Sequence, residues 1–455
     1  MSVRFELTAE CLAERASRGP RYTSYPPATE IRAIAPERVT QELARIAADG
    51  TPIGLYAHIP FCVSLCAYCG CNVIPTRDTT RGDAYVDQLI TELALLSEQL
   101  SGNPTTEVSL GGGSPNFLEP AAIRRLMAGV RRYFAPLQDA RMSVELDPRR
   151  TTASQLYAFR EMGFGTMSVG VQDFAAPVQD AIRRHQSAVQ TKWLIDRARH
   201  EGFTDINVDI VYGLPKQSDE SFADTIDTII DLAPDRIALF GYAHLPSKLP
   251  HQILVERAGR VLDRYERATL LLLAIDKLTA AGYVHLGLDH FAKPSSRLAR
   301  AAAEHRMIRN FQGYVEHRAD VILGVGVTAI SQTPRLIWQN TNELAPWRDA
   351  LLAGRLPSER GIPLDRDDQL RRDVIGKLMC DGEVALNELG RTYGVDAKEY
   401  FAPELRQLIE LQDLASFDGA TIRTTSMGRL LVRNVCMVFD RYFQPGGETR
   451  FSSTI

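Results

Sequence analysis

The chain has 455 residues, of which 45% are hydrophobic and 24% are charged, and it carries a net charge of −4. This length exceeds what one small core can organise, so we expect two or three packed units. The charge argues against a basic surface for nucleic acid or an anionic membrane, and no apolar run approaches the ~20 residues of a membrane span. The first residues, MSVRFELTAECLAERA, lack the apolar core of a signal peptide, so we expect a cytoplasmic protein.

Residues 1–50 form an N-terminal extension with the unusual string GPRYTSYPPATE, and we expect this extension to lie over an active site. From 51 to 300, strand-like runs alternate with amphipathic helical stretches. The expected strands are IGLYAHI, TEVSLGG, RMSVEL, TMSVGVQ, INVDIVYGL, RIALFGYAHL and YVHLGLDH. Strand followed by helix, six or seven times, predicts a parallel sheet with helices outside, closed or nearly closed into a (β/α) barrel.

Residues 301–365 are less regular and are expected to connect the barrel to a second unit, with GRLPSERGIPLDRDD as a linker. Residues 366–455 are mainly helical, with a short β-like piece, ASFDGATIRTT. Helices followed by a small hairpin resemble a winged-helix unit. Because no Lys/Arg-rich recognition face stands out, a structural or active-site cap is favoured over nucleic-acid binding.

Four of the seven cysteines, Cys62, Cys66, Cys69 and Cys71, fall within ten residues. An odd number of cysteines without an export signal argues against a disulfide framework. The cluster follows the first expected strand, and loops at the carboxyl ends of parallel strands build active sites. The remaining cysteines stand alone, and Cys380 and Cys436 lie in apolar helical patterns typical of the core.

The C-x₃-C-x₂-C spacing of Cys62, Cys66 and Cys69 can supply three thiolates to a [4Fe–4S] cluster and leave one iron open. An open iron can chelate S-adenosylmethionine (SAM), whose reductive cleavage releases a 5′-deoxyadenosyl radical. A zinc site is the alternative, but structural zinc prefers four ligands, commonly in two separated pairs. Only Gly70 separates Cys69 from Cys71, so Cys71 is expected beside the cluster and not as a ligand.

Small and polar residues mark the ends of the next expected strands. Gly111, Gly112 and Gly113 precede Ser114, which favours close contact between backbone and a ligand, although a tight turn alone would also explain them. Further candidates for contact with SAM are Glu145, Gln172, Asp173 and Asp209, and a salt-bridged structural role is the alternative for any single carboxylate among them. Arg184 suits a carboxylate partner or a solvated helix position equally well.

The motifs, in order, resemble the oxygen-independent coproporphyrinogen III oxidases, a family of radical SAM enzymes. The resemblance rests on PRYTSYP, YAHIPFC, the CGC ending of the cysteine loop, GGGSP, VELDPR, SVGVQDF, DIVYGLPKQ, YAHLP, GLDHFAKP, RNFQGY and GRLLVRN, from residue 20 to about 434. The family implies a partial radical-SAM barrel with a C-terminal helical domain. It also implies oxidative decarboxylation of two propionates of coproporphyrinogen III to vinyl groups, giving protoporphyrinogen IX.

The resemblance also assigns roles to residues. Cys62, Cys66 and Cys69 ligate the cluster, and Tyr56, Gly112 and Glu145 match positions that bind the cluster-bound SAM. A second SAM site is matched by Tyr68, Gly113, Ser114, Gln172, Arg184, Asp209, Ala243 and Ile330. Candidate anchors for the tetrapyrrole are Arg21, Lys293 and Arg309, and we expect Tyr22 and Tyr25 to line or gate its pocket. A low-potential electron donor, an electron acceptor and a monomeric enzyme are expected.

Several positions depart from the family pattern. Leu110 stands in place of an aromatic residue, Thr166 in place of an arginine, Gly241 in place of an asparagine and Ile308 in place of a histidine. These departures keep two alternatives open. One is a related radical SAM enzyme, such as a C-methyltransferase or a haem-degrading enzyme. The other is a haem chaperone, which is not expected to carry PRYTSYP or the long C-terminal domain.

Overall fold

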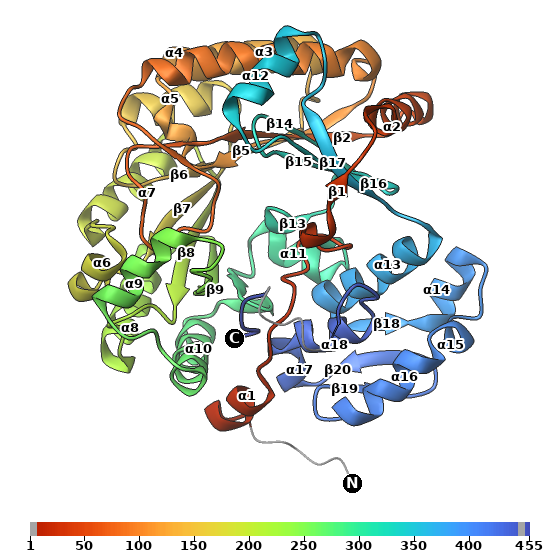
Figure 1. Ribbon diagram of the computed structural model, residues 1–455. Coiled ribbons are helices and arrows are strands. Elements are labelled where there is room, and N and C mark those ends of the chain that lie inside the picture. Colours follow the sequence, from red (N-terminus) through yellow and green to blue (C-terminus); the bar gives the residue numbers. More distant parts are fainter. Residues whose placement is uncertain (1–6, 445–450) are drawn as a thin grey trace.

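The computed structural model describes residues 7–444 and 451–455. Its main sheet contains seven neighbouring parallel strands that curve into a partial barrel (Figure 1). In spatial order they are β14 (Val321–Val325), β2 (Ile53–Ile59), β5 (Thr105–Gly112), β6 (Arg141–Leu146), β7 (Thr166–Gln172), β8 (Asp205–Tyr212) and β9 (Arg236–Gly241). The partial barrel predicted from the sequence is therefore confirmed.

Helices cover the outside of the barrel. They are α3 (Thr80–Leu100), α4 (Pro120–Phe134), α5 (Ala153–Glu161), α6 (Ala176–Ile182), α7 (Ala188–Glu201), α8 (Asp219–Leu232), α9 (Ile253–Ala258) and α10 (Arg264–Ala280). In α8, Phe222, Ile226 and Ile229 repeat at helical spacing and are fully buried. A capping box between Ser218 and Ser221 starts this helix by satisfying backbone N–H groups that lack helical partners.

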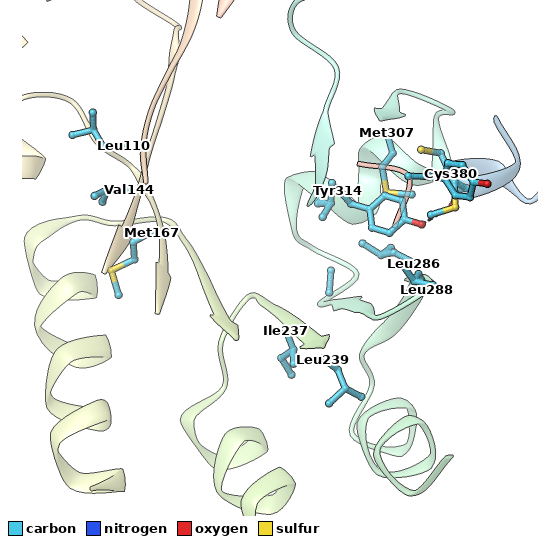
Figure 2. Packing of buried hydrophobic residues seen from close by; sticks show 14 of the residues in the cluster. Leu110, Val144, Met167, Ile237, Leu239, Leu286, Leu288, Met307, Tyr314 and Cys380 are labelled. Carbon is cyan, nitrogen blue, oxygen red and sulfur yellow. Dashed lines mark hydrogen bonds between the residues drawn. The ribbon is translucent and has the colours of Figure 1, made fainter. Parts of the chain in front are cut away.

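The two faces of the barrel strands differ in chemistry. Leu110, Val144 and Met167 are buried and belong to the main hydrophobic core (Figure 2). Side chains alternate along a strand, so the residues between them point to the opposite face. That inner face carries polar groups such as Ser143 and Ser168, and it lines the cavities described below.

The seventh expected strand, residues 283–290, is not part of the parallel set. It forms a hairpin of β10 (Val284–Gly287) and β11 (His290–Ala292), and β11 pairs antiparallel with β9. The reversal uses Gly287 at φ +144° and Leu288 at φ +46°. The parallel strand that the sequence pattern does not indicate is β14.

Residues 301–365 therefore do more than connect two units. After α11 (Arg297–Ala303) and the hairpin β12 (Met307–Asn310)–β13 (Gly313–Glu316), they supply β14. They then form an antiparallel meander of β15 (Ile330–Gln332), β16 (Leu336–Asn340) and β17 (Ser358–Pro363), with α12 (Leu344–Leu352) between the last two strands. The expected linker contains β17. Gly324 is needed because a Cβ there would lie 2.6 Å from the Ile330 carbonyl oxygen.

The N-terminal extension contains α1 (Ala9–Arg15), the edge strand β1 (Arg32–Ala33) and α2 (Pro36–Asp49). The cysteine loop is bounded by β3 (Phe61–Cys62) and β4 (Ile74–Pro75). Short 3₁₀ turns occupy Ala28–Glu30, Pro115–Phe117, Pro250–Gln252 and Ile409–Leu411. In Figure 1 the extension runs between the barrel and the C-terminal helices.

The C-terminal unit packs beside the open side of the barrel (Figure 1). Its helices are α13 (Arg366–Asp381), α14 (Leu386–Tyr393), α15 (Ala397–Tyr400), α16 (Ala402–Leu408), α17 (Ser426–Leu430) and α18 (Val432–Val438). A small antiparallel sheet joins β18 (Glu383–Ala385), β20 (Thr421–Thr424) and β19 (Ala415–Phe417), as in a winged-helix unit. Cys380 and Cys436 are buried in this unit, as expected. Within the described ranges, no helix combines the length and apolar composition needed to cross a membrane.

Candidate active site

The cysteine loop opens onto a cavity of about 610 Å³ at the carboxyl ends of the barrel strands. Cys62, Cys66, Cys69 and Cys71 all line this cavity. The loop is held from outside: the Ala67 amide donates to the Ile182 carbonyl at 2.9 Å, and the His251 ring contacts the Cys69 carbonyl oxygen at 2.8 Å. The thiols are thus presented on a backbone anchored to two helical segments.

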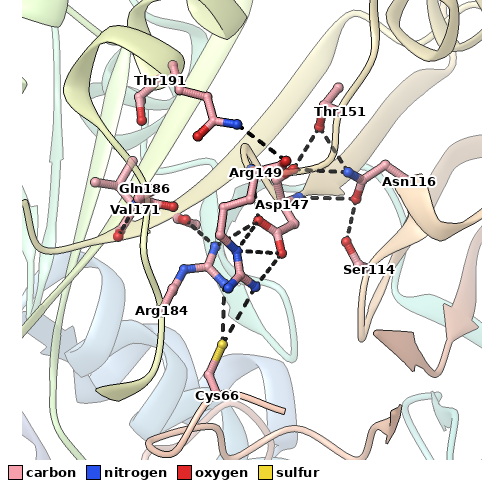
Figure 3. A network of polar contacts seen from close by, with 12 residues as sticks. Cys66, Ser114, Asn116, Asp147, Arg149, Thr151, Val171, Arg184, Gln186 and Thr191 are labelled. Carbon is pink, nitrogen blue, oxygen red and sulfur yellow. Dashed lines mark hydrogen bonds and ion pairs between the residues drawn. The ribbon is translucent and has the colours of Figure 1, made fainter. Parts of the chain in front are cut away.

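Two arginines approach the Cys66 thiol (Figure 3). Arg184 Nη1 lies 3.6 Å and Arg149 Nη2 lies 3.7 Å from its sulfur. Asp147 binds both guanidinium groups, with shortest distances of 2.6 Å to Arg149 and 3.3 Å to Arg184. Positive charge beside a thiol favours the thiolate, which is the form that binds iron.

The donor set fits an iron–sulfur cluster. In a cubane each thiolate binds a different iron, so the three sulfurs must stand apart around one space. Among the described residues, no three His, Cys, Asp or Glu side chains gather closely enough to hold a single metal ion. Cys71 also lines the cavity, and its hydrogen bond to Cys69 is the largest cause lowering the pKa of the Cys69 thiol to about 6.

The glycines at the end of β5 leave no room for larger residues, because a Cβ atom at these positions would clash with neighbouring atoms. A Cβ on Gly113 would lie 2.7 Å from the Pro60 carbonyl oxygen, and one on Gly112 would lie 2.6 Å from the His58 ring. Gly112 also adopts φ +111°, which disfavours other residues. Gly112 and Gly113 both line the cavity. The same two residues therefore pack closely against neighbouring segments and present an open surface to a ligand.

Glu145 joins this surface to the barrel interior. Its carboxylate accepts a hydrogen bond from the Gly112 amide at 3.1 Å. Desolvation inside the barrel, with a smaller contribution from the neighbouring Asp209 carboxylate, raises the pKa of Glu145 to about 7, although its side chain is open to the cavity. Tyr56, on β2, lines the barrel interior next to it, with its hydroxyl 3.3 Å from His58 Nδ1.

Most residues expected at a second SAM site also line the large cavity: Tyr68, Gly113, Gln172, Arg184, Asp209 and Ala243. Asp209 accepts hydrogen bonds from Ser168 at 2.9 Å and from Asn207 at 2.7 Å. Arg184 is only 7% exposed, so the solvated alternative is wrong, and its Nε has no hydrogen-bond partner among the described residues.

Three expected positions lie elsewhere. Asp173 is fully buried and accepts hydrogen bonds from Gln217 and the Ala175 amide, so its role is structural, through neutral hydrogen-bond donors and not through the ion pair given as the alternative. The Ser114 hydroxyl donates to Asn116 beneath the glycine surface, and it does not line the cavity. Ile330, on β15, packs against a small apolar cluster that includes Ile337.

The tetrapyrrole candidates divide in the same way. Arg21 and Arg309 line a second cavity of about 340 Å³ inside the barrel. Lys293 does not: its ammonium binds the Ala233 carbonyl oxygen at 2.6 Å, before the start of β9, at the end of the sheet opposite the cysteine loop. Tyr22 donates to Asp440 at 3.0 Å, and the Tyr25 hydroxyl accepts from the Arg441 amide at 3.2 Å, so both tie the extension to the C-terminal unit.

Asp147, Arg149 and His251 are parts of the site to which the sequence analysis assigned no role. Asp147 and Arg149 follow β6 and face the cysteine loop. Both belong to the motif VELDPR, so the signal that could have indicated them was present in the sequence. His251 lies 182 residues from its partner Cys69, and no local pattern could have predicted that contact.

Comparison with known proteins gives concordant results. The family model "Radical SAM superfamily" matches residues 56–229, and "HemN C-terminal domain" matches residues 364–431. The chain is 39% identical over 449 residues to oxygen-independent coproporphyrinogen III oxidase of Pseudomonas aeruginosa, covering 96% of each chain. It is also 39% identical over 441 residues to the enzyme of the same name from Escherichia coli K12, again covering 96% of each chain.

A solved structure agrees with these relatives. It is described as "Coproporphyrinogen III oxidase (HemN) from Escherichia coli is a Radical SAM enzyme" and superposes with a TM-score of 0.89 at 39% identity, covering 93% of this chain and 98% of that one. Identity at this level extends across the barrel and the C-terminal unit. The chain therefore belongs to the oxygen-independent coproporphyrinogen III oxidases, radical SAM enzymes that use a [4Fe–4S] cluster and SAM.

Proposed function

We propose that this protein converts coproporphyrinogen III to protoporphyrinogen IX by decarboxylating two propionates to vinyl groups. The observation that carries the proposal is the junction of two cavities. The cavity bearing the three thiols and the inner cavity bearing the arginines share Arg21, Glu145, Ser168, Asp209 and Phe240 as lining residues. A cofactor that generates radicals and a substrate that carries carboxylates can therefore meet inside one barrel.

Each side chain has a distinct task in this proposal. Cys62, Cys66 and Cys69 hold the cluster, while Tyr56, Gly112 and Glu145 surround the SAM bound to it. Reductive cleavage of SAM supplies the radical that removes a hydrogen atom from a propionate β-carbon. The substrate then loses CO₂ and passes one electron to an acceptor, which balances the change from propionate to vinyl.

The second SAM site is proposed on a narrower set than the resemblance implied. Tyr68, Gly113, Gln172, Arg184, Asp209 and Ala243 are supported by their positions around the large cavity, whereas Ser114 and Ile330 are not. The electron donor, the electron acceptor and a monomeric, cytoplasmic enzyme also remain proposals. So does the division into an extension, a barrel, a connecting region and a C-terminal unit.

The test is an anaerobic assay of the reconstituted protein with SAM, a low-potential reductant, an electron acceptor and coproporphyrinogen III. We expect a product that has lost two CO₂ units, and we expect Cys66→Ala to abolish it. Formation of 5′-deoxyadenosine with an unchanged tetrapyrrole would contradict the proposed substrate. Attention would then turn to the family departures at Leu110 and Thr166, which line the inner cavity, and at Gly241, which lines the outer one.

A further inference from the structure

The inner cavity contains arginines that the protein does not pair. It lies between the inner faces of β5–β9 and the hairpin β12–β13, and Arg21, Arg141, Arg236 and Arg309 all line it. Arg236 is satisfied by Asp205 at 2.8 Å, and Arg21 donates to the Gly241 carbonyl at 2.8 Å. Of the two remaining guanidinium groups, Arg309 makes one longer hydrogen bond, and Arg141 makes none among the described residues.

The guanidinium group of Arg309 forms a hydrogen bond only through its Nε, among the described residues. Its Nε donates to the Arg21 carbonyl at 3.3 Å, and its carbon lies 4.7 Å from the centre of the Tyr314 ring. Its Nη1 is buried and, among the described residues, has no hydrogen-bond partner. A buried N–H of a charged group without an acceptor is costly, so this geometry is typical of a site that receives one from a ligand.

Arg141 is the first residue of β6, and within the described part of the chain its side chain forms no hydrogen bond or ion pair. Burial is the main cause that lowers its pKa, and the nearby Arg236 lowers it further. The opposing charges Glu107, Asp205 and Glu316 act on it only from beyond ion-pair distance. Asp205 is already engaged by Arg236, and Glu316 by Arg306 and Arg318. Glu107 lies opposite Arg141 in the register of β5 and β6, and the two charges act on each other without forming an ion pair.

Two acidic residues line this cavity, and neither forms an ion pair with its arginines. Asp209 accepts hydrogen bonds from Ser168 and Asn207, and burial raises its pKa. Glu145 accepts a hydrogen bond from the Gly112 amide. Among the described residues that line the inner cavity, arginines therefore outnumber carboxylates.

We propose that Arg141 and Arg309 form a carboxylate subsite that anchors a propionate of the substrate that is not decarboxylated. This inference rests on the proposed function and names the part of the barrel that positions its substrate. Arg141 and Glu145 lie on the same face of β6, four residues apart, and so are separated by about 13 Å along the strand. That separation is on the scale of a tetrapyrrole, so one propionate reaches the arginines while another lies at the SAM end.

The test is a fluorescence titration of the SAM-loaded holoenzyme with coproporphyrin III, the stable oxidised form that keeps all four carboxylates. We expect Arg141→Gln and Arg309→Gln each to weaken binding by about 10- to 100-fold, the range of a hydrogen bond to a charged group. Arg141→Lys should restore part of the affinity, because lysine keeps the positive charge but cannot donate two parallel hydrogen bonds to one carboxylate. The exposed Arg38→Gln on α2 is the matched control and should bind as the wild type does.

The tetramethyl ester of coproporphyrin III separates carboxylate recognition from shape. We expect the ester to bind weakly, with an affinity that Arg141→Gln does not change. Wild-type affinity of Arg141→Gln for coproporphyrin III, or equal weakening for acid and ester, would overturn the subsite. Unchanged cluster absorbance and a Tm no lower than that of the wild type would show that Arg141→Gln is folded.

The same variants separate the subsite from the reaction. A wild type that binds coproporphyrin III through Arg141 but releases no CO₂ would retain the subsite and refute the proposed reaction. If the wild type decarboxylates coproporphyrinogen III and Arg141→Gln has the wild-type KM, the proposed reaction is supported and the carboxylate subsite is refuted. We expect an increase in KM of about 10-fold or more in Arg141→Gln, because a remote anchor contributes binding energy to substrate and transition state alike.

Discussion

The two ends of the barrel treat their charged groups in opposite ways. At the cysteine end, Asp147, Arg149 and Arg184 neutralise one another around the Cys66 thiol. At the inner end, Arg141 and Arg309 point into a cavity without such partners among the described residues. The cofactor end is thus organised before ligands arrive, whereas the inner end keeps donors free for a substrate that brings its own negative charge.

The largest effect that tests this comparison is expected from Arg184→Met. Arg184 is 7% exposed and holds Asp147, so its removal leaves a buried carboxylate with Arg149 alone. We expect a loss of about 2–3 kcal/mol in the free energy of unfolding, measured by urea titration of the apo protein. Iron content after reconstitution should fall as well. Wild-type stability in this variant would show that the cysteine end is not pre-organised by charge pairing.

A buried carboxylate away from both ends of the barrel, Glu92, shows how much stability a buried charge costs when no cation pairs with it. Glu92 is 1% exposed and accepts hydrogen bonds from the Gly326 amide, Asn340 and Trp347, yet burial raises its pKa to about 7. In the unfolded chain its pKa is about 4.3, so the folded state binds the extra proton between these values. The cost of this charge is therefore fully present above pH 7 and disappears as the pH falls towards about 4.3.

The measurement is urea unfolding at pH 8, 7, 6 and 5 for the wild type and Glu92→Gln. We expect the stability difference between the two to change with pH by up to about 1.4 kcal/mol per pH unit, in the direction that favours the wild type at low pH. Parallel pH profiles for the two proteins would contradict the raised pKa. Groups that titrate equally in both proteins cancel in the difference, so the comparison isolates Glu92.

A smaller effect of opposite sign is expected at the inner end. Because Arg141 lacks a partner among the described residues, Arg141→Gln should raise the free energy of unfolding of the substrate-free protein by about 1 kcal/mol. Differential scanning calorimetry of the apo proteins checks this. Destabilisation comparable to that of Arg184→Met would mean that Arg141 is a structural residue, and the contrast between the two ends would fail.

The smallest effect is expected on the surface. Arg124 and Glu161 form a 2.6 Å ion pair, with both side chains 40% exposed. Arg124→Ala should change stability by less than about 0.5 kcal/mol and leave iron content unchanged, because water screens exposed pairs. Urea unfolding and iron content, measured in parallel for Arg124→Ala and Arg184→Met, provide the matched comparison. A loss as large as that of Arg184→Met would show that burial is not what distinguishes the cysteine end.

The sequence alone determined the features that depend on local spacing. The alternation of apolar strands with amphipathic helices predicted six of the seven parallel strands, and the spacing of Cys62, Cys66 and Cys69 predicted their shared cavity. Strand ends carry site residues in a barrel, so Glu145 and Asp209 could be chosen by position. The string of motifs from PRYTSYP to GRLLVRN was also sufficient to identify the family, because it spans nearly the whole chain in order.

Only the tertiary structure decided the features that depend on contacts between distant segments. It turned residues 283–290 into a hairpin, recruited β14 from an irregular stretch, and moved Lys293 and Tyr22 away from the inner cavity. In each case a backbone reversal or a remote partner, such as Asp440 for Tyr22, overrides the local pattern. The unpaired state of Arg141 is of the same kind, because the absence of a partner among the described residues is a property of the whole packed barrel and not of the residues beside it in the chain.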